Sequence, residues 1–585
     1  MNAYFERMLR ESRWVFVLGL LVLAVALVMY IRAGLFEFNS FDDPSYVSMN
    51  ASVLAKFSWA SVKAAFSPHQ AIYWSPLTTL SFMLDSQFYH LWAGGYHATN
   101  ALWHAANAAA FFGLILALTN NRFAAVLAAL LFAVHPAHVE AVAWISARKD
   151  VLSTFFGLSS ILIYIRWTRR PGAALAVGLY CSFALSLMAK PMFVTLPGLL
   201  LLLDFWPLAR LDAQPHEGHV PFWPDRRLVI ARIREKVLLL SMGVLITFLT
   251  LSMHPQTQDR LDPDLGLKIA NAFASILNYL GLLIWPSHQA LLYPFPDSVP
   301  LAQSLGGAAL VLAVTGFCLW QARRRSYLLV GWLWFLCTLV PVIMPPKVGL
   351  HVAFADRWTY VPFMGLYLAL ACLAAEVLGK IERPFARGVA VVAMVLLPVI
   401  PLGLAQQRQL STWETPLLTY EQAMRYTKGN YLVLNNYGVH KAEAGDAAAA
   451  EKAFVEALQI YPDFGLCKLN LGALLLKQSR RDEALDLLWS AKVLLEKDGQ
   501  AYDAYRGVAM CLIRKNKLDL AQGFFALAIR EQPKRPEAYE EWGALARRLG
   551  DPRRAQQFLQ QALETKDFPA SRLTLDDLKA APSNP

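Results

Sequence analysis

The chain has 585 residues, of which 56% are hydrophobic and only 17% are charged. This balance excludes an ordinary soluble globular protein of that length, so much of the surface must face lipid. The net charge of +11 does not indicate nucleic-acid binding, because the basic residues cluster in short loops between apolar runs, as the topology of a membrane protein requires.

The first apolar run covers residues 14–31 and follows three arginines at positions 7, 10 and 13. Bulky Met29, Tyr30 and Ile31 stand where a signal peptidase needs small residues. We therefore predict that this run is an uncleaved first membrane span.

Ten further runs approach the roughly 20 apolar residues that a membrane-crossing helix needs. They cover residues 98–118, 123–138, 151–167, 172–189, 192–206, 236–253, 305–321, 327–344, 358–376 and 388–404. One more apolar stretch, 269–285, is interpreted as a re-entrant or interfacial segment, because a full crossing there would move the arginines at 323–325 to the outer face. With about eleven spans, the basic loops lie in the cytoplasm and the C-terminal region lies outside.

The composition changes after residue 404, which ends the predicted membrane domain (residues 1–404). A linker helix at 405–427 leads into residues 428–566, where the sequence repeats with a period near 34, the length of a tetratricopeptide repeat. Matching positions carry small and apolar residues, for example Gly438, Ala450, Phe454 and Ala457, then Gly472, Ala484, Leu488 and Ala491. We predict an all-α fold of four helical hairpins here, with an insertion near residues 496–499 and a tail at 567–585. The concave groove of such an array suits a peptide or a partner helix.

The unusual polar residues of the membrane domain fall almost entirely on the predicted outer side. Asp42 and Asp43 stand in the first outer loop, and three side chains spaced to share one helix face follow at His97, Asn100 and His104. The other members of this group are His135, His138, Glu140, Arg148, Lys149, Lys190, Asp356 and Arg357. Cations on this side run against the positive-inside bias, so they need anionic partners, such as a lipid phosphate.

Adjacent carboxylates repel each other, which raises the pKa of one and suits it to accept a proton or to hold a cation. Structural alternatives remain open. Asp42 and Asp43 could simply turn a loop or cap a helix. The histidines and Asn100 could satisfy one another between helices, two histidines with Glu140 could bind a metal, and Arg357 could pair with Asp356 or with a loop carbonyl.

Several motifs together resemble one family, the transmembrane and tetratricopeptide repeat containing proteins, in their bacterial form. They are Phe41-Asp42-Asp43, Pro76-Leu77-Thr78, His97-x-x-Asn100-x-x-x-His104, His135-Pro-x-His138-x-Glu140, Lys190-Pro191, Leu203-Asp204-x-Trp206-Pro207 and the segment 355–362. The resemblance covers residues 35–566. It implies a fold like that of the GT-C membrane glycosyltransferases, relatives of the protein O-mannosyltransferases, with Asp42-Asp43 in the place of the family's acidic motif. Eukaryotic members have an acidic residue where this chain has Pro191, and Glu where it has Asp356.

The resemblance implies that the protein transfers a sugar from a polyprenyl phosphate to a Ser or Thr hydroxyl of an exported protein. Asp42 or Asp43 would be the catalytic base, and Arg148, Lys149, Lys190 and Arg357 would hold the donor phosphate. The supporting residues are His97, Asn100, His104, His135, His138, Glu140 and Asp356. No cofactor is expected beyond a possible divalent cation, and the repeats would bind the acceptor.

We expect the chain in the inner membrane of a bacterium, with the repeats on the periplasmic side and no nucleic-acid partner. Two other functions stay open. One is an oligosaccharide ligase or polymerase of the O-antigen type, which would use a lipid diphosphate and a very long late outer loop. The other is a non-enzymatic scaffold that assembles secretion or pilus components through the repeats.

Overall fold

The structure is a computed structural model that describes residues 2–67, 74–212, 225–252, 263–343, 352–496 and 499–565. Within these ranges the protein is helical apart from one two-stranded sheet. The chain divides into two compact units, Met1–Thr427 and Lys428–Pro585. The expected tail at 567–585 lies outside the described residues, as do residues 497–498 of the expected insertion.

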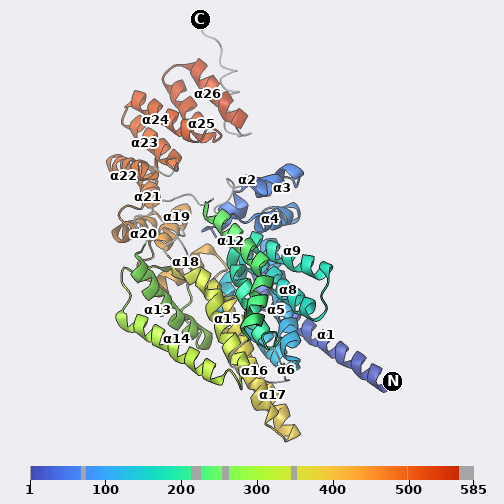
Figure 1. Cartoon of the computed structure of the whole chain (residues 1–585). Helices are drawn as coiled ribbons and strands as arrows, with labels where there is room; N and C mark the ends of the chain where they lie inside the picture. Colours follow the sequence, from blue (N-terminus) through green and yellow to red (C-terminus); the bar gives the residue numbers. More distant parts are fainter. Residues whose placement is uncertain are drawn as a thin grey trace. The chain divides into compact units, whose positions relative to one another are not determined.

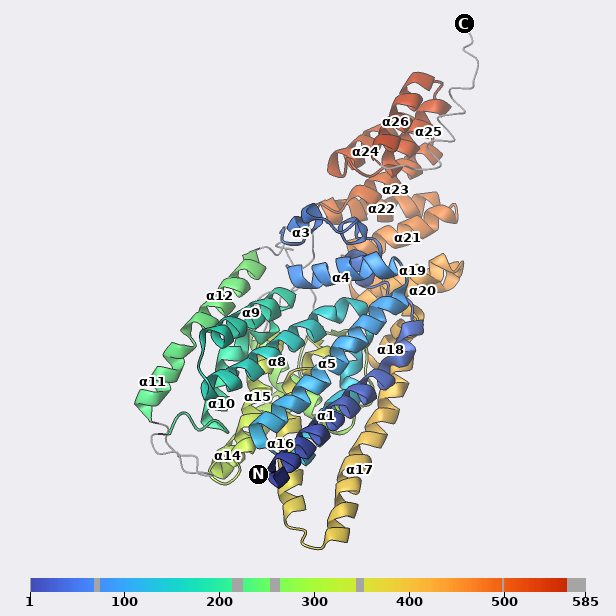
Figure 2. The same ribbon diagram turned by 90° about the vertical axis from the view of Figure 1, so that its right-hand side faces the viewer.

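The first unit is a bundle of long helices capped at one end by short ones (Figures 1 and 2). Its helices are α1 (Asn2–Tyr30), α2 (Ala51–Leu54), α3 (Trp59–Ala65), α4 (Pro76–Tyr89), α5 (Ala93–Thr119), α6 (Arg122–Val134), α7 (Val139–Ala143), α8 (Arg148–Arg169), α9 (Ala173–Ala189), α10 (Leu196–Phe205), α11 (Arg226–Glu235), α12 (Val237–Ser252), α13 (Leu265–Ile284), α14 (Leu301–Gln321), α15 (Ser326–Ile343), α16 (Pro362–Gly379), α17 (Pro384–Ser411) and α18 (Pro416–Tyr426). Strands β1 (Tyr293–Pro294) and β2 (Val352–Phe354) pair antiparallel.

Helix α5 lies at the centre of the bundle and packs against α1, α6 and α8, while α16 packs against α6 and α15. Helices α15 and α16 touch backbone to backbone, because a Cβ on Gly331 would overlap the carbonyl oxygen of Gly365. Small residues at such a crossing let membrane helices approach closely. This contact fixes the position of the turn Asp356–Thr359, which leads into α16. Figure 2 shows α3 and α4 at one end of the bundle and the turn between α16 and α17 at the other.

Eight described helices are long and apolar enough to cross a membrane, and one bent pair makes a ninth. The bent pair, Arg122–Val134 and Pro136–Ala143, replaces the straight span predicted at 123–138 and turns by 56°. Pro136 explains this difference, since proline has no N–H to continue the helix. The spans predicted at 172–189, 192–206 and 236–253 form apolar helices of 10–17 residues. Helix α16 begins at Pro362 and not at 358, because residues 356–359 form a separate turn.

Helix α13 forms where we predicted a re-entrant or interfacial segment, and it meets the length and apolarity criteria for a full crossing. The segment after α13 lies at the Asp356 end of α16, since Gln289 and Tyr293 both bond to Asp356. Arg325, which follows α14, pairs with Glu376 near the other end of α16. Helix α14 therefore runs from one end of the bundle to the other, and the re-entrant or interfacial placement of residues 269–285 stays a prediction.

Helix α17 does not end at residue 404 but continues to Ser411. The glutamines that follow the apolar run explain the extension, because Gln406 and Gln407 both donate hydrogen bonds to the carbonyl of Met29 in α1. The segment expected as a linker helix at 405–427 thus consists of the end of α17 followed by α18.

The described residues of the second unit, 428–496 and 499–565, form a stack of four helical hairpins. They are α19 (Tyr431–Glu443) with α20 (Ala447–Ile460), α21 (Gly465–Lys477) with α22 (Arg481–Leu495), α23 (Tyr502–Arg514) with α24 (Leu518–Glu531), and α25 (Glu537–Arg548) with α26 (Pro552–Thr565). The recurring glycines lie where paired helices meet, since a Cβ on Gly438 would lie 2.6 Å from Phe454 and one on Gly472 would lie 2.7 Å from Leu488. An all-α membrane bundle followed by a tetratricopeptide solenoid is thereby confirmed.

Candidate active site

The two adjacent aspartates of the first loop face in different directions. Asp43 is fully buried, and its carboxylate accepts hydrogen bonds from the backbone N–H of Asn39 at 2.8 Å and of Ser146 at 2.9 Å, as well as from the Ser146 hydroxyl. These bonds tie the first loop to the turn Ile145–Ala147, just before α8. Burial raises the pKa of Asp43 to about 7 even though the three hydrogen bonds favour its charged form.

Asp42 has a different environment. Within the described residues its carboxylate accepts no hydrogen bond, but it lies close enough to Lys149 and Arg357 for both charges to act on it. Burial raises the pKa of Asp42, and the two cations offset that rise only in part. Asp42 is only partly exposed, has a raised pKa and accepts no hydrogen bond from a described residue, so it is suited to accept a proton.

Arg357 is held in place by Glu140. One oxygen of Glu140 accepts the backbone N–H of Arg357 at 2.8 Å, and the other accepts its guanidinium, which also lies 5.1 Å from the centre of the Trp144 ring. The Arg357 side chain remains 12% exposed. The alternative in which Arg357 pairs with Asp356 is wrong, since Asp356 instead accepts hydrogen bonds from Gln289 and Tyr293.

Two lysines complete the group of cations. Lys149 donates to the Tyr46 hydroxyl at 3.2 Å, and Lys190 forms an ion pair of 2.5 Å with Asp150. Burial lowers the pKa of Lys190 and the charges of Arg357 and Lys149 lower it further, whereas Asp150 raises it. Lys149 and Arg357 therefore both act electrostatically on Lys190. We call Asp42, Lys149, Asp150, Lys190 and Arg357 the acid–base cluster.

Arg148 does not join this cluster, although we predicted that it would hold phosphate. Its guanidinium is fully buried, pairs with Asp85 at 2.8 Å, donates to Ser81 and to the Tyr96 carbonyl, and lies over the Phe82 ring. Neighbouring helix residues point about 100° apart, so Arg148 and Lys149 at the start of α8 face different surroundings. Arg148 holds α8 against α4 and α5.

The predicted supporting residues of α5 bond to protein groups. Asn100 donates to the carbonyls of Val142 and Trp144, at 3.1 Å each, and accepts from Arg148. His104 contacts the Tyr360 hydroxyl at 2.8 Å and the Ala133 carbonyl at 3.2 Å, and His97 contacts the Glu37 carbonyl at 3.3 Å. The three residues thus join α5 to neighbouring segments and not to one another.

His135 and His138 also make bonds within the bundle. His135 contacts the Leu283 carbonyl at 3.2 Å and accepts the backbone N–H of Ala137, and His138 contacts the Tyr367 hydroxyl at 3.3 Å. No three His, Cys, Asp or Glu side chains come together as a metal site anywhere in the described part of the chain. The alternative of a metal bound by two histidines and Glu140 thus has no support from these residues.

Sequence reasoning missed Tyr46, Asp85 and Asp150 as members of these networks. Asp85 and Asp150 are carboxylates with 7% and 3% exposure, and charged side chains are rarely buried without a partner. Their place beside apolar spans could have identified them as partners of nearby cations. The hydroxyl of Tyr46 gave no comparable signal.

A separate charged group lies at the opposite end of α8, around Asp204 of the Leu203-Asp204 motif. Lys236 and Arg210 pair with Asp204 at 2.5 and 3.0 Å, and the Tyr164 hydroxyl donates to the same carboxylate. This group joins α8 and α10 to the junction between α11 and α12, and it lies near the end of α8 opposite to Lys149.

No protein-family model matches the chain. The human protein named Protein O-mannosyl-transferase TMTC3 is 25% identical over 86% of this chain and 58% of its own length. The Caenorhabditis elegans protein named Protein O-mannosyl-transferase F38B6.6 is 23% identical over 72% of this chain and 60% of its own length. The chain thus spans somewhat over half the length of these relatives.

Among solved structures, the archaeal oligosaccharyltransferase AglB from Archaeoglobus fulgidus, in complex with an inhibitory peptide and a dolichol-phosphate, matches 76% of this chain and 60% of its own chain. Its sequence identity is 13% and its TM-score is 0.37. The match to the human and nematode relatives agrees with the resemblance that the motifs around Asp42 and His135 indicate. The order of the two units, a membrane helix bundle followed by a repeat solenoid, agrees with the same resemblance. The chain is similar over most of its length to relatives named as TMTC protein O-mannosyl-transferases, at 23–25% identity.

Proposed function

We propose that this protein is a membrane glycosyltransferase that transfers one sugar from a polyprenyl-phosphate donor to a Ser or Thr hydroxyl of an exported protein. The observation that carries the proposal is the position of Asp42, a carboxylate with a raised pKa beside Lys149 and Arg357. A base next to cations is the arrangement that transfer from a phosphate leaving group requires. The names of the relatives support the same class of reaction.

The reaction would be a single displacement. The acceptor oxygen attacks the anomeric carbon of the sugar and forms the new C–O bond, while the bond from that carbon to the phosphate oxygen breaks and its electron pair leaves with the polyprenyl phosphate. Asp42 takes the proton of the acceptor hydroxyl, and the anomeric configuration inverts. Asp43 would position the loop that carries Asp42, through its hydrogen bonds to Ser146.

Lys149, Lys190 and Arg357 would bind the donor phosphate and stabilise its growing negative charge. Lys190 and Arg357 are suited to this role because their side chains keep 19% and 12% exposure although each also has a protein carboxylate as partner. Charge-assisted bonds to phosphate oxygens are stronger than neutral ones, especially from the planar guanidinium of arginine. Because the donor is lipid-linked, the polyprenyl chain would lie between membrane helices.

The first test compares Asp42→Asn with the parent protein in vesicles supplied with a labelled polyprenyl-phosphate sugar and a Ser/Thr-containing acceptor. Loss of transfer with retained thermal stability is expected, since an amide at this position cannot take a proton. Glu382→Gln is a suitable control, because its side chain is exposed and lies in the turn before α17. Full transfer by Asp42→Asn would refute the mechanism.

The repeats would bind the acceptor protein and raise its concentration near the membrane unit. Deletion of residues 428–566 should lower transfer to a protein acceptor, while transfer to a short Ser-containing peptide at high concentration should persist. An unchanged rate and acceptor range for the protein acceptor would refute this role. We place the acid–base cluster and the repeats on the non-cytoplasmic side of a bacterial inner membrane, and reaction of impermeant probes with single cysteines at either end of α16 would test that side.

The scaffold alternative predicts that the purified protein transfers no sugar at all, so the same assay separates it from the proposal. It assigns no task to the acid–base cluster. The ligase or polymerase alternative predicts a preference for lipid diphosphate over lipid monophosphate, which a competition between the two donors would detect.

A further inference from the structure

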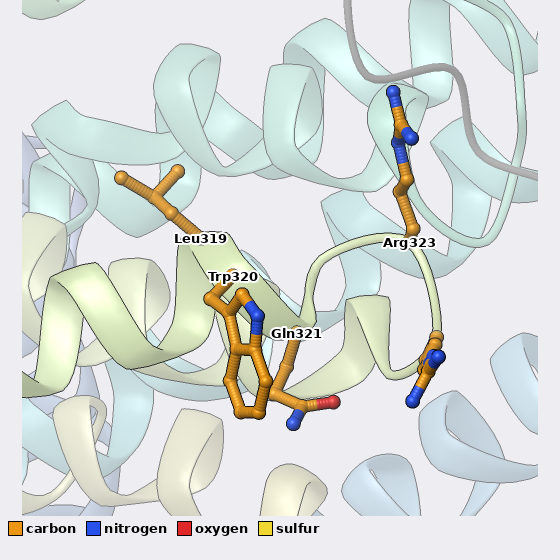
Figure 3. A pocket seen from close by; sticks show the side chains of 5 residues that line it. Leu319, Trp320, Gln321 and Arg323 are labelled. Carbon is orange, nitrogen blue, oxygen red and sulfur yellow. The ribbon is translucent and has the colours of Figure 1, made fainter.

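A pocket bordered by described residues lies far from the acid–base cluster, at the C-terminal end of α14. It has a volume of about 510 Å³ and is lined by Leu319, Trp320, Gln321, Arg323 and Arg324 (Figure 3). The next residue, Arg325, pairs with Glu376 near the end of α16 that lies away from Asp356. The pocket therefore belongs to the end of the bundle where the charge distribution predicts the cytoplasm.

The apolar part of the pocket continues an exposed apolar surface. Helix α14 buries only Ser304, Gly307, Cys318 and Gln321, whereas Leu312 and Trp320 are each 73% exposed. In a helix that crosses a membrane, such a surface faces the acyl chains of lipids. Trp320 stands at the end of this surface, and tryptophan is enriched at the level of the lipid headgroups.

The polar part of the pocket carries positive charge. Arg323 and Arg324 are both exposed, and the Arg324 side chain makes no ion pair or hydrogen bond with a described residue. Arg325, the third of these consecutive arginines, is neutralised by Glu376. Figure 3 shows Arg323 projecting beyond the end of the helix, while Trp320 lies along its last turn.

We propose that this pocket binds the phosphodiester headgroup of an anionic membrane phospholipid. The arginines contact the phosphate, Trp320 packs at the level of the glycerol, and an acyl chain lies along the exposed face of α14. Charge complementarity selects an anionic over a zwitterionic lipid, because basic pockets at the cytoplasmic ends of membrane helices attract anionic headgroups. The guanidinium group suits this role because it matches phosphate oxygens in geometry. The proposal is independent of the transferase reaction.

Native mass spectrometry of the full-length protein in detergent tests it, with added phosphatidylglycerol or phosphatidylcholine as the probe. The parent protein should retain phosphatidylglycerol preferentially. The double variant Arg323→Gln/Arg324→Gln should bind it roughly thirtyfold more weakly, since each basic residue near a lipid surface contributes about a factor of five. Trp320→Ala should weaken binding while it leaves the charge unchanged.

The matched control is Arg383→Gln/Arg387→Gln, which removes two exposed arginines at the start of α17, at the same end of α16, without altering the pocket. This control should retain phosphatidylglycerol as the parent does. Excess inorganic phosphate should not displace the lipid, because it has no acyl chain to bind along α14. Equal loss in both double variants, equal retention in both, or displacement by inorganic phosphate alone would each overturn the proposal.

Discussion

Lys190 and Asp150 form an ion pair of 2.5 Å between the lysine Nζ and one carboxylate oxygen, and the other oxygen of Asp150 has no hydrogen-bond partner among the described residues. Asp150 is 3% exposed and the Lys190 side chain is 19% exposed, so Asp150 contacts the lysine from its buried side. Burial and the charges of Arg357 and Lys149 lower the pKa of Lys190, and the negative charge of Asp150 opposes that lowering.

Asp150→Asn should therefore weaken donor binding. Without the carboxylate, the pKa of Lys190 falls further, and the lysine loses its proton at a lower pH than in the parent. The loss of one charge-assisted bond corresponds to about 1.5–3 kcal/mol, or roughly a tenfold to hundredfold higher KM for the lipid donor at alkaline pH. Steady-state kinetics at several pH values would measure the KM for the lipid donor. A KM that changes equally at every pH would contradict control of the Lys190 charge by Asp150.

Asp43→Asn should destabilise the fold more than Asp42→Asn does. The new amide N–H at position 43 would point at an N–H or O–H group that now donates a hydrogen bond to the Asp43 carboxylate. The Asp42 carboxylate accepts no hydrogen bond from the described residues. A buried donor left without an acceptor costs about 1–3 kcal/mol. Thermal unfolding in detergent should show a lower Tm for Asp43→Asn and an unchanged one for Asp42→Asn, and equal Tm values for the two variants would contradict the assigned roles.

The stability of the parent should also depend on pH through Asp43. Its pKa is raised from the ordinary 3.8 to about 7, so the folded state holds a proton that the unfolded state releases between these values. The contribution of this proton to the free energy of unfolding is fully present below pH 3.8 and is lost as pH rises through about 7. The Tm of the parent should fall over that range more steeply than the Tm of Asp43→Asn, and parallel curves would exclude a raised pKa.

Transfer activity should fall on the acid side because Asp42 must be deprotonated to accept a proton. Burial raises the pKa of Asp42, so the loss should begin at a higher pH than for an exposed aspartate. The profile of kcat/KM against pH measures this loss at acid pH, which we call the acid limb, because kcat/KM reports the pKa values of groups in the free enzyme. The limb should persist in Asp43→Asn, and its disappearance there would assign it to Asp43.

Arg148→Gln should act on stability and not on donor binding. It leaves Asp85 buried without its partner, and breaking a buried ion pair costs about 3–5 kcal/mol. A combined Arg148→Met/Asp85→Leu variant should recover much of the lost Tm, because it removes both charges. A raised donor KM at unchanged Tm in Arg148→Gln would instead return Arg148 to the phosphate site.

The membrane bundle and the repeats could be predicted from the sequence because both depend on local patterns. A run of apolar residues long enough to cross the membrane is stabilised in lipid whatever its neighbours are, as in α1 and α5. The 34-residue period places glycine and alanine where paired helices meet, as at Gly438 and Gly472. Bends and helix ends were predicted less well, because they depend on single residues such as Pro136 and on distant contacts such as that of Gln407 with Met29.

The order of residues is enough to tell which side-chain types gather at one end of the bundle: two adjacent carboxylates and several basic groups outside the apolar spans. It does not tell which partner each of them meets. Packing of the helices turns Asp42 toward Lys149 and Arg357, bonds Asp43 to Ser146, and pairs Arg148 with Asp85 away from the cluster. Adjacent residues point in different directions, and each meets a partner from a segment far away in the chain, so no local pattern could have assigned these roles.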